Sequence, residues 1–251
     1  MVGADALPVS IGPRRIVCLT EEPTETLYAL GEADRIVGIS GFTVRPPRAR
    51  KEKPKVSAFT SAKIGQILEL RPDFVIGFSD IQADIAAALI RHGVEVWISN
   101  HRSVDGTLDY IRRLGALVGA GERANAYADE LRRGLDAIAA DAARLPCRPK
   151  VYFEEWDEPL ITGIQWVAEL VRIAGGDDIF PERAPHHLVA VGQDARPGWD
   201  AIPAVRDGEL HEVKSPLILQ PGPAALTDGV EAIAAIIREW SARQPSRDQQ
   251  R

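Results

Sequence analysis

The sequence lacks the short motifs that mark the common enzyme families. It has no GxSxG nucleophile elbow, no HExxH zinc motif, no phosphate loop of the Walker type and no GxGxxG dinucleotide motif. Cysteine is scarce as well: Cys18 and Cys147 are the two that occur, and they form neither a CxxC metal motif nor a disulfide framework. We therefore predict a protein that is not an enzyme and that has no catalytic residues, no metal site and no intrinsic cofactor.

Long apolar runs and an excess of positive charge are also missing. No stretch of about 18 apolar residues occurs, so we predict no membrane span. The net charge is -6, and the one basic run, Arg45–Lys55, is broken by prolines and a glutamate, so we interpret it as a solvated loop and expect no nucleic-acid partner. The first residues, Met1–Arg15, have neither the charged start nor the apolar core of a secretory signal. We expect a cytoplasmic protein, or a periplasmic one whose signal has been removed.

The first half of the chain alternates between strand and helix patterns. Short apolar runs typical of buried strands occur at Arg15–Leu19, Arg35–Ser40, Pro72–Phe78 and Val94–Ser99. Helical patterns follow them, at Pro23–Leu30, Thr60–Asp73, Ile81–Gly93 and Ser103–Gly119. Strands separated by helices of this length favour a parallel sheet with helices on both faces.

A longer helical pattern, Glu122–Leu145, interrupts this alternation. Beyond it we expect a strand, a helix, a second strand, a loop and a last helix, at Lys150–Trp156, Gly163–Gly176, Gly208–Val213, Lys214–Pro223 and Leu226–Trp240. The predicted fold is α/β, with two Rossmann-like lobes joined by one long helix and a shortened second lobe. The predicted boundaries are residues 14–120, 121–148 and 149–241, followed by a disordered tail, 242–251.

The turn after the first strand, Thr20–Glu25, is acidic, whereas a nucleotide-binding turn is rich in glycine. A helix N-terminus favours negative charge, so Glu21, Glu22 and Glu25 satisfy that field internally and would repel a phosphate. Two interpretations stay open for these acids. They either cap the helix, or they form a polar rim for a neutral or positively charged ligand.

Aromatic side chains follow several of the predicted strands, at the edge where ligands of open parallel sheets bind. Core packing explains any one of these side chains better than ligand binding does. Together they suit a large, flat, partly apolar ligand. The aromatic residues at these positions are Phe42, Phe59, Phe78, Trp156 and Trp166.

Polar candidates at the same strand ends are Asp80 and His101. His101 is a better ligand candidate than the adjacent pair His186-His187, because neighbouring residues on an irregular segment are more often simply exposed. The acidic run Glu154–Glu158 has the chemistry to bind a hard cation. Alternate side chains of a strand point to opposite faces, however, so these carboxylates cannot easily converge.

The order of several phrases resembles the cobalamin and ferric-siderophore class of ABC-transporter substrate-binding proteins. In the first lobe the phrases are RIVCLTEEPTETLYALG, RIVGISGFTVRPP and KPKVSAFTSAKIGQILELRPDFVIGF, of which ILELRPDFVI is the most characteristic. The second lobe continues the likeness with RPKVYFEEW, ITGIQWVAELVRIAGGDDIF, RPGWDAIPAVRDGELHEV and LILQPGPAALTDGVEAIAAII. The likeness covers residues 14–240 and implies two α/β lobes with a stiff helical link.

The resemblance also implies a ligand site between the lobes. Carried over by position, the contacts are Thr24, Phe42, Phe59, Thr60, Trp156, Trp166, Ile218, Leu219 and Gln220, to which we add Glu25, Asp80 and His101 from the loop analysis. The implied ligand is cobalamin or a ferric siderophore, with haem also bound in the family. The implied partner is an ABC permease, and we expect a monomer.

Two positions depart from the family pattern. Where members usually carry an acidic residue that docks onto the permease, this sequence has Gly65, with Glu69 one turn further on. In the second lobe a helix and a buried strand are missing near Asp194-Ala195.

Two hypotheses of function follow. The first is a binding protein for a cobalamin-like corrinoid or a ferric siderophore that serves ABC-type import. The alternative is a cytoplasmic enzyme or chaperone that handles corrinoids or metals on the same scaffold.

Overall fold

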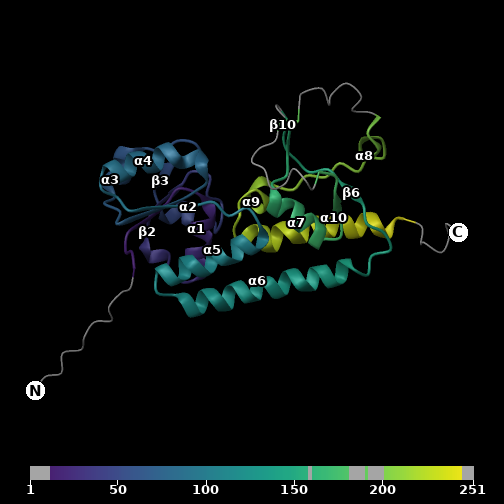
Figure 1. Ribbon diagram of the computed structural model, residues 1–251, viewed down its shortest axis with the longest axis horizontal. Coiled ribbons are helices and arrows are strands. Elements are labelled where there is room, and N and C mark those ends of the chain that lie inside the picture. Colours follow the sequence, from purple (N-terminus) through teal and green to yellow (C-terminus); the bar gives the residue numbers. More distant parts are fainter. Residues whose placement is uncertain (1–11, 158–159, 181–189, 192–200, 245–251) are drawn as a thin grey trace, which may run out of the picture. The chain divides into compact units, whose positions relative to one another are not determined.

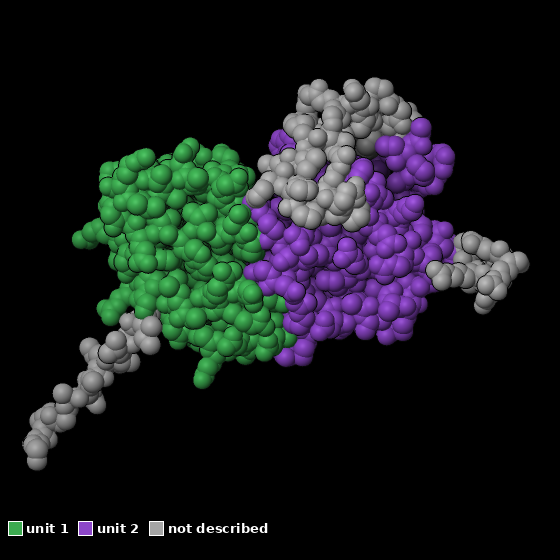
Figure 2. Space-filling view, in the orientation of Figure 1, with its two compact units in different colours: residues 1–101, 108–129 green, residues 102–107, 130–251 purple. Residues whose placement is uncertain are grey.

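The computed structural model describes residues 12–157, 160–180, 190–191 and 201–244. The chain separates into two compact units, shown in different colours in Figure 2. Unit 1 contains residues 1–101 and 108–129, and unit 2 contains residues 102–107 and 130–251. The predicted departure at Asp194-Ala195 and most of the predicted tail lie outside the described residues.

Unit 1 is built on a five-stranded parallel sheet with the strand order β3-β2-β1-β4-β5. Its strands are β1 (Ile16–Cys18), β2 (Ile36–Ser40), β3 (Lys55–Ser57), β4 (Phe74–Phe78) and β5 (Val96–Ser99). Every residue of the interior strands β1 and β4 is buried, as are four of the five residues of the third interior strand, β2, which is why these strands appear in the sequence as continuous apolar runs. The prediction of an α/β fold with a parallel sheet is confirmed.

Helices cover both faces of this sheet (Figure 1). One face carries α1 (Glu21–Ala29) and α5 (Val104–Leu117), and the other carries α3 (Ile64–Glu69) and α4 (Ala83–Arg91). The alternation of side chains along β1 serves both faces, because successive residues of a strand point in opposite directions. Val17 and Leu19 pack in one core cluster with Ile67 of α3 and Leu89 of α4.

The long helix α6 covers Gly121–Ala142, close to the predicted span Glu122–Leu145. Its residues up to Asp129 belong to unit 1, and the remainder belongs to unit 2. Within unit 1 the backbones of α5 and α6 come very close at Gly115, where an added Cβ would lie 2.1 Å from the Cβ of Ala124. In the part of the chain that the structure describes, no helix is both long and apolar enough to cross a membrane.

Unit 2 contains two small sheets and the C-terminal helices. In one sheet β6 (Lys150–Val151) runs parallel to β9 (Asp177–Asp178), and the other is antiparallel, formed by β7 (Glu154–Asp157), β8 (Leu160–Thr162) and β10 (Ala190–Val191). The helical elements are α7 (Gln165–Ile173), α8 (Pro203–Arg206), α9 (Ser215–Ile218), the π-helix η5 (Ala225–Gly229) and α10 (Val230–Ala242). The buried faces of α7 and α10 pack together and form the core of this unit.

Three local predictions are wrong. The run Arg45–Lys55 contains the short helix α2 (Ala49–Glu52) and the first residue of β3, an edge strand that the sequence did not predict. The described residues Gly208–Val213 form no strand; Leu210 is 57% exposed there, so no apolar face anchors one. The predicted loop Lys214–Pro223 contains α9, whose first turn accommodates a proline.

Candidate functional site

We place the candidate site at the carboxyl-terminal edge of the sheet in unit 1. Strands β1 and β4 are neighbours, but β1 leads through α1 to β2 on one side and β4 leads through α4 to β5 on the other. Where the connections of adjacent parallel strands diverge in this way, a crevice lies beyond the strand ends, and ligands of open α/β sheets bind there. The acidic turn follows β1 and the segment Ser79-Asp80 follows its neighbour β4, so both lie at this edge of the sheet.

Glu22 is completely buried at the start of α1. Its Oε1 accepts a hydrogen bond from the Thr20 hydroxyl at 2.6 Å, and its Oε2 has no partner among the described residues. Burial raises the pKa of Glu22 to about 7; the bond from Thr20 lowers it, and the nearby charges of Glu21 and Glu25 raise it further. Of the two interpretations left open for these acids, the polar rim does not apply to Glu22, whose carboxyl group has no exposed surface.

Glu21 is buried as well and holds the loop that follows β2. Its Oε1 accepts hydrogen bonds from the backbone N–H groups of Val44, at 2.9 Å, and Arg45, at 2.6 Å. Burial raises the pKa of Glu21 to about 7, against the lowering effect of these two bonds. The Arg45 side chain donates from Nε to Glu25 Oε1 at 2.9 Å, so two acids of the turn bind the same loop.

The loop held by Glu21 presents an aromatic side chain to solvent. The guanidinium of Arg50 fixes its other side, donating from Nη1 to the carbonyl groups of Gly41 and Thr43 at 2.7 Å each. Between these anchors Phe42 is 60% exposed. An apolar ring that is exposed on a loop fixed from both sides is preorganised for contact with a ligand.

We expect the substitution Glu21→Ala to release this loop without unfolding unit 1. The N–H groups of Val44 and Arg45 would lose their acceptor, so their amide hydrogen exchange should become at least about tenfold faster. Glu25→Ala is the matched control, because it removes the partner of the Arg45 side chain but leaves both backbone bonds intact. Equal exchange rates in the two variants would show that Glu21 does not hold the loop.

The loops after β3 and β4 are joined by one side chain. Gln82 donates from Nε2 to the Phe59 carbonyl at 2.9 Å, and its Oε1 accepts from the Phe78 backbone N–H at 3.1 Å. Phe59 is half-buried, while Thr60 and Asp80 are exposed. These three predicted site residues therefore lie on loops of the same sheet edge as Phe42.

Two predicted site residues of unit 1 lie in its interior instead. Thr24 is fully buried, and its hydroxyl donates to the Thr20 carbonyl at 3.5 Å. His101 is 7% exposed, with its ring stacked on Tyr110 at 4.6 Å between centroids and set edge-on to Phe78 at 5.3 Å. Both side chains are packed inside the unit, which makes them weaker candidates for ligand contact than the exposed residues.

Ser79 has a backbone conformation that sequence reasoning did not find. Its φ of 65° and ψ of 171° fall in a region that glycine alone adopts readily, at a cost of about 1–3 kcal/mol for other residues. The segment is fixed by the Ser79 N–H, which donates to the Ser99 carbonyl at 2.7 Å. Such strain is concentrated at functional sites, and here it lies at the end of β4, beside Asp80.

The predicted site residues of unit 2, like those of unit 1, include both buried and accessible side chains. Trp166 and Ile218 are buried, and the indole Nε1 of Trp166 donates to the Ile218 carbonyl at 2.9 Å, which joins α7 to α9. Leu219 and Gln220 follow α9 and are half-buried. Trp156 of β7 is 60% exposed.

Metal-binding groups do not gather anywhere in the described part of the chain, where no three His, Cys, Asp or Glu side chains come together as a possible site. The pair His186-His187 lies outside the described residues. Cys18 is buried, and burial raises the pKa of its thiol to about 12, so it is a packing residue and not a reactive thiolate.

A parallel α/β sheet with exposed aromatic and polar groups along its carboxyl-terminal edge, followed by a long helix and a second compact unit, defines a two-unit ligand-binding protein. A family model described as "Periplasmic binding protein" matches residues 16–211. The chain belongs to this family.

Known proteins similar to this chain agree with that assignment. A vitamin B12-binding protein of Vibrio vulnificus (strain YJ016) is 24% identical over 249 residues, which are 90% of this chain and 89% of that protein. The crystal structure of the periplasmic vitamin B12 binding protein BtuF of Vibrio cholerae superposes with a TM-score of 0.73 at 23% identity, covering 92% of this chain and 99% of that one. The periplasmic heme-binding protein BhuT in complex with two hemes superposes with a TM-score of 0.72 at 21% identity, covering 89% and 98%. At these identities the structures show the shared fold, and the relatives are binding proteins rather than enzymes.

Proposed function

We propose that this protein binds a large planar ligand at the carboxyl-terminal edge of unit 1, and that the ligand is a cobalamin-like corrinoid. The observation that carries the proposal is the loop of Phe42. Glu21 and Arg50 hold this loop in place, while the ring of Phe42 itself is 60% exposed. Phe59 and Thr60 on the next loop supply further apolar and polar contact. Rigid aromatic surface of this kind suits a flat macrocycle with polar substituents.

The relatives support this class of ligand and leave its choice to experiment. Proteins named for vitamin B12 and for heme both share the fold and most of the chain length. Haem and ferric siderophores are therefore the alternative ligands. Glu25, Asp80, Trp156, Leu219 and Gln220 stay predicted contacts. Thr24, His101, Trp166 and Ile218 are buried, so the exposed residues are the stronger candidates.

We further propose that the protein works in the periplasm with an ABC permease as its partner. Support comes from the family. The departure at Gly65 speaks against the usual docking contact, and the exposed Glu69 is the acidic residue near it on α3. The alternative of a cytoplasmic enzyme or chaperone draws no support from the similar proteins, which are binding proteins.

Calorimetric and spectroscopic titration with cyanocobalamin, haem and a ferric siderophore tests the proposal. We expect saturable binding of one of them at one site per chain, with cyanocobalamin the tightest. Absence of both heat and spectral change with all three would contradict the proposed function.

Phe42→Ala should weaken binding of the best ligand about tenfold, because a stacked aromatic contact contributes about 1 kcal/mol or more beyond its buried area. Ile90→Ala is the matched control: Ile90 is 59% exposed in the last turn of α4, towards the opposite edge of the sheet. An equal loss in both variants would indicate a general effect on the fold. No loss in Phe42→Ala would remove this ring from the site.

A further inference from the structure

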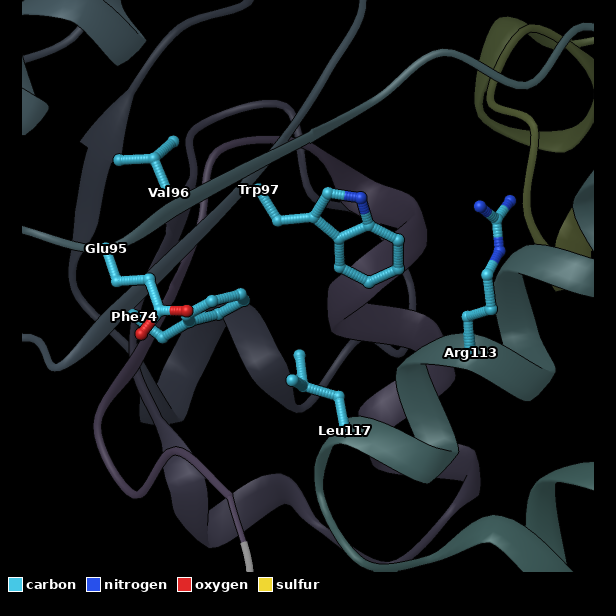
Figure 3. Close-up of a pocket in the computed structure, with 6 residues that line it drawn as sticks. All are labelled: Phe74, Glu95, Val96, Trp97, Arg113 and Leu117. Carbon is cyan, nitrogen blue, oxygen red and sulfur yellow. The ribbon is translucent and has the colours of Figure 1, made fainter.

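A separate groove lies in unit 1 between the edge strand β5 and α5. It has a volume of about 310 Å³ and is lined by Phe74, Glu95, Val96, Trp97, Arg113 and Leu117 (Figure 3). Sites for small molecules in proteins begin at about 300 Å³, so the groove is large enough for a compact organic ligand. Phe74 begins β4 and Glu95 precedes β5, which puts the groove at the amino-terminal ends of these strands, away from the site proposed above.

Trp97 gives this groove a rigid aromatic wall. Its ring packs against Tyr110 at 5.3 Å between centroids, and Tyr110 is fully buried and stacks in turn on His101 at 4.6 Å. The side chain is therefore held from behind, while its own surface is half-buried. In Figure 3 the six-membered ring of Trp97 points into the space bordered by Phe74, Leu117 and Arg113.

The two charged side chains of the groove come from different elements. Arg113 on α5 has its guanidinium carbon 6.0 Å from the centre of the Trp97 ring. Its Nε donates to the Asp109 carbonyl at 3.4 Å, and among the described residues no partner binds its two terminal nitrogens. Glu95 lies on the strand side (Figure 3). An anionic group is thus favoured near α5 and disfavoured near the strands.

We propose that this groove is a second ligand site, which takes a planar aromatic carboxylate. The aromatic ring would pack against Trp97 and Leu117, which are both half-buried and leave apolar surface accessible. The carboxylate would accept hydrogen bonds from the terminal nitrogens of Arg113, whose planar fork matches a carboxylate in a bidentate arrangement. This site is independent of the corrinoid proposal, because it shares neither residues nor sheet edge with it.

Proton–nitrogen NMR spectra of the full chain, titrated with 2-naphthoate, test the proposal. The chain has five tryptophans, and the indole N–H signal of Trp97 is assigned as the one that Trp97→Phe removes. We expect a saturable shift of this signal. The neutral analogue 2-naphthamide has the same ring system and should bind about tenfold more weakly, since it lacks the charge-assisted bonds to Arg113.

Arg113→Gln should weaken 2-naphthoate about tenfold, to the level of the amide. Arg112→Gln is the matched control on the same helix, because the Arg112 guanidinium is already engaged by Asp129 at 2.8 Å. The proposal is overturned if 2-naphthoate at millimolar concentration leaves the Trp97 signal in place, or if acid and amide bind the unaltered protein equally well. It is also overturned if Arg113→Gln binds as tightly as Arg112→Gln. The comparison of 2-naphthoate with 2-naphthamide uses the unaltered protein, so it tests the proposal even if a variant folds poorly.

Discussion

Gly115→Ala is expected to destabilise unit 1 by about 2 kcal/mol, although alanine is the better helix former. A Cβ at this position would lie 2.1 Å from the Cβ of Ala124 and 3.3 Å from the Ala120 carbonyl oxygen. None of these atoms belongs to a flexible side chain, so α5 and α6 would have to move apart. The separation would disturb the packing of Leu114 and Ala128, both of which are fully buried.

Gly134→Ala on α6 is the matched control, with an effect of opposite sign. Gly134 also lies within a helix, but an added Cβ there would meet no atom within 4 Å. Helix propensity alone then acts, and the variant should gain about 0.5–1 kcal/mol. Urea unfolding of the two variants and the unaltered protein gives both numbers. Stabilisation by both substitutions would mean that α5 and α6 do not pack closely at Gly115.

Glu22→Gln is expected to change how stability depends on pH. Burial raises the pKa of Glu22 from 4.5 to about 7, so the folded protein keeps this proton where the unfolded chain has lost it. In the unaltered protein the favourable contribution is complete below about pH 4.5, falls as the pH rises, and is lost above about pH 7. Glutamine cannot ionise. Between about pH 4 and pH 8 the variant should therefore gain on the order of 3 kcal/mol relative to the unaltered protein.

The measurement is urea unfolding at a series of pH values, with exchange of the β1 amides as a reading specific to unit 1. Glu69→Gln is the control, because Glu69 is an exposed acid of α3. Its stability curve should run parallel to that of the unaltered protein. Glu21 also has a raised pKa, of about 7, and contributes equally to the unaltered protein and to Glu69→Gln. In Glu22→Gln its contribution is smaller, because it no longer faces the charge of Glu22. If the Glu22→Gln curve also runs parallel to that of the unaltered protein, ionisation of Glu22 does not lower the stability of the folded state.

The acidic turn has a structural role that is closely linked to the proposed site. Glu21 accepts both N–H groups of the segment Val44-Arg45, and Glu25 pairs with the Arg45 side chain. The carboxylates that make the turn unsuitable for a phosphate thus hold the loop that carries Phe42. Because the pKa of Glu21 is raised to about 7, the charge of this anchor changes near neutral pH.

The sequence by itself determined the α/β class and most of unit 1. Interior strands such as β4 are buried on both faces, and a residue pattern of this kind is visible without any knowledge of neighbours. Helix α6 was also predictable, since a long amphipathic period needs only local spacing. The edge strand β3 was not, because three residues after a proline carry too little periodicity to be distinguished from a loop.

Only the tertiary structure decided which of the predicted contact residues are exposed. Phe42 and His101 both follow a strand of the same sheet, yet one ring is 60% exposed and the other is enclosed between Phe78 and Tyr110. Glu21 is a further case, because its carboxylate is bound by the loop after β2, more than twenty residues away in the sequence. Residue type and spacing place a side chain on an element, but exposure and pKa depend on chain segments distant in sequence, which come together only when the sheet and its helices are assembled.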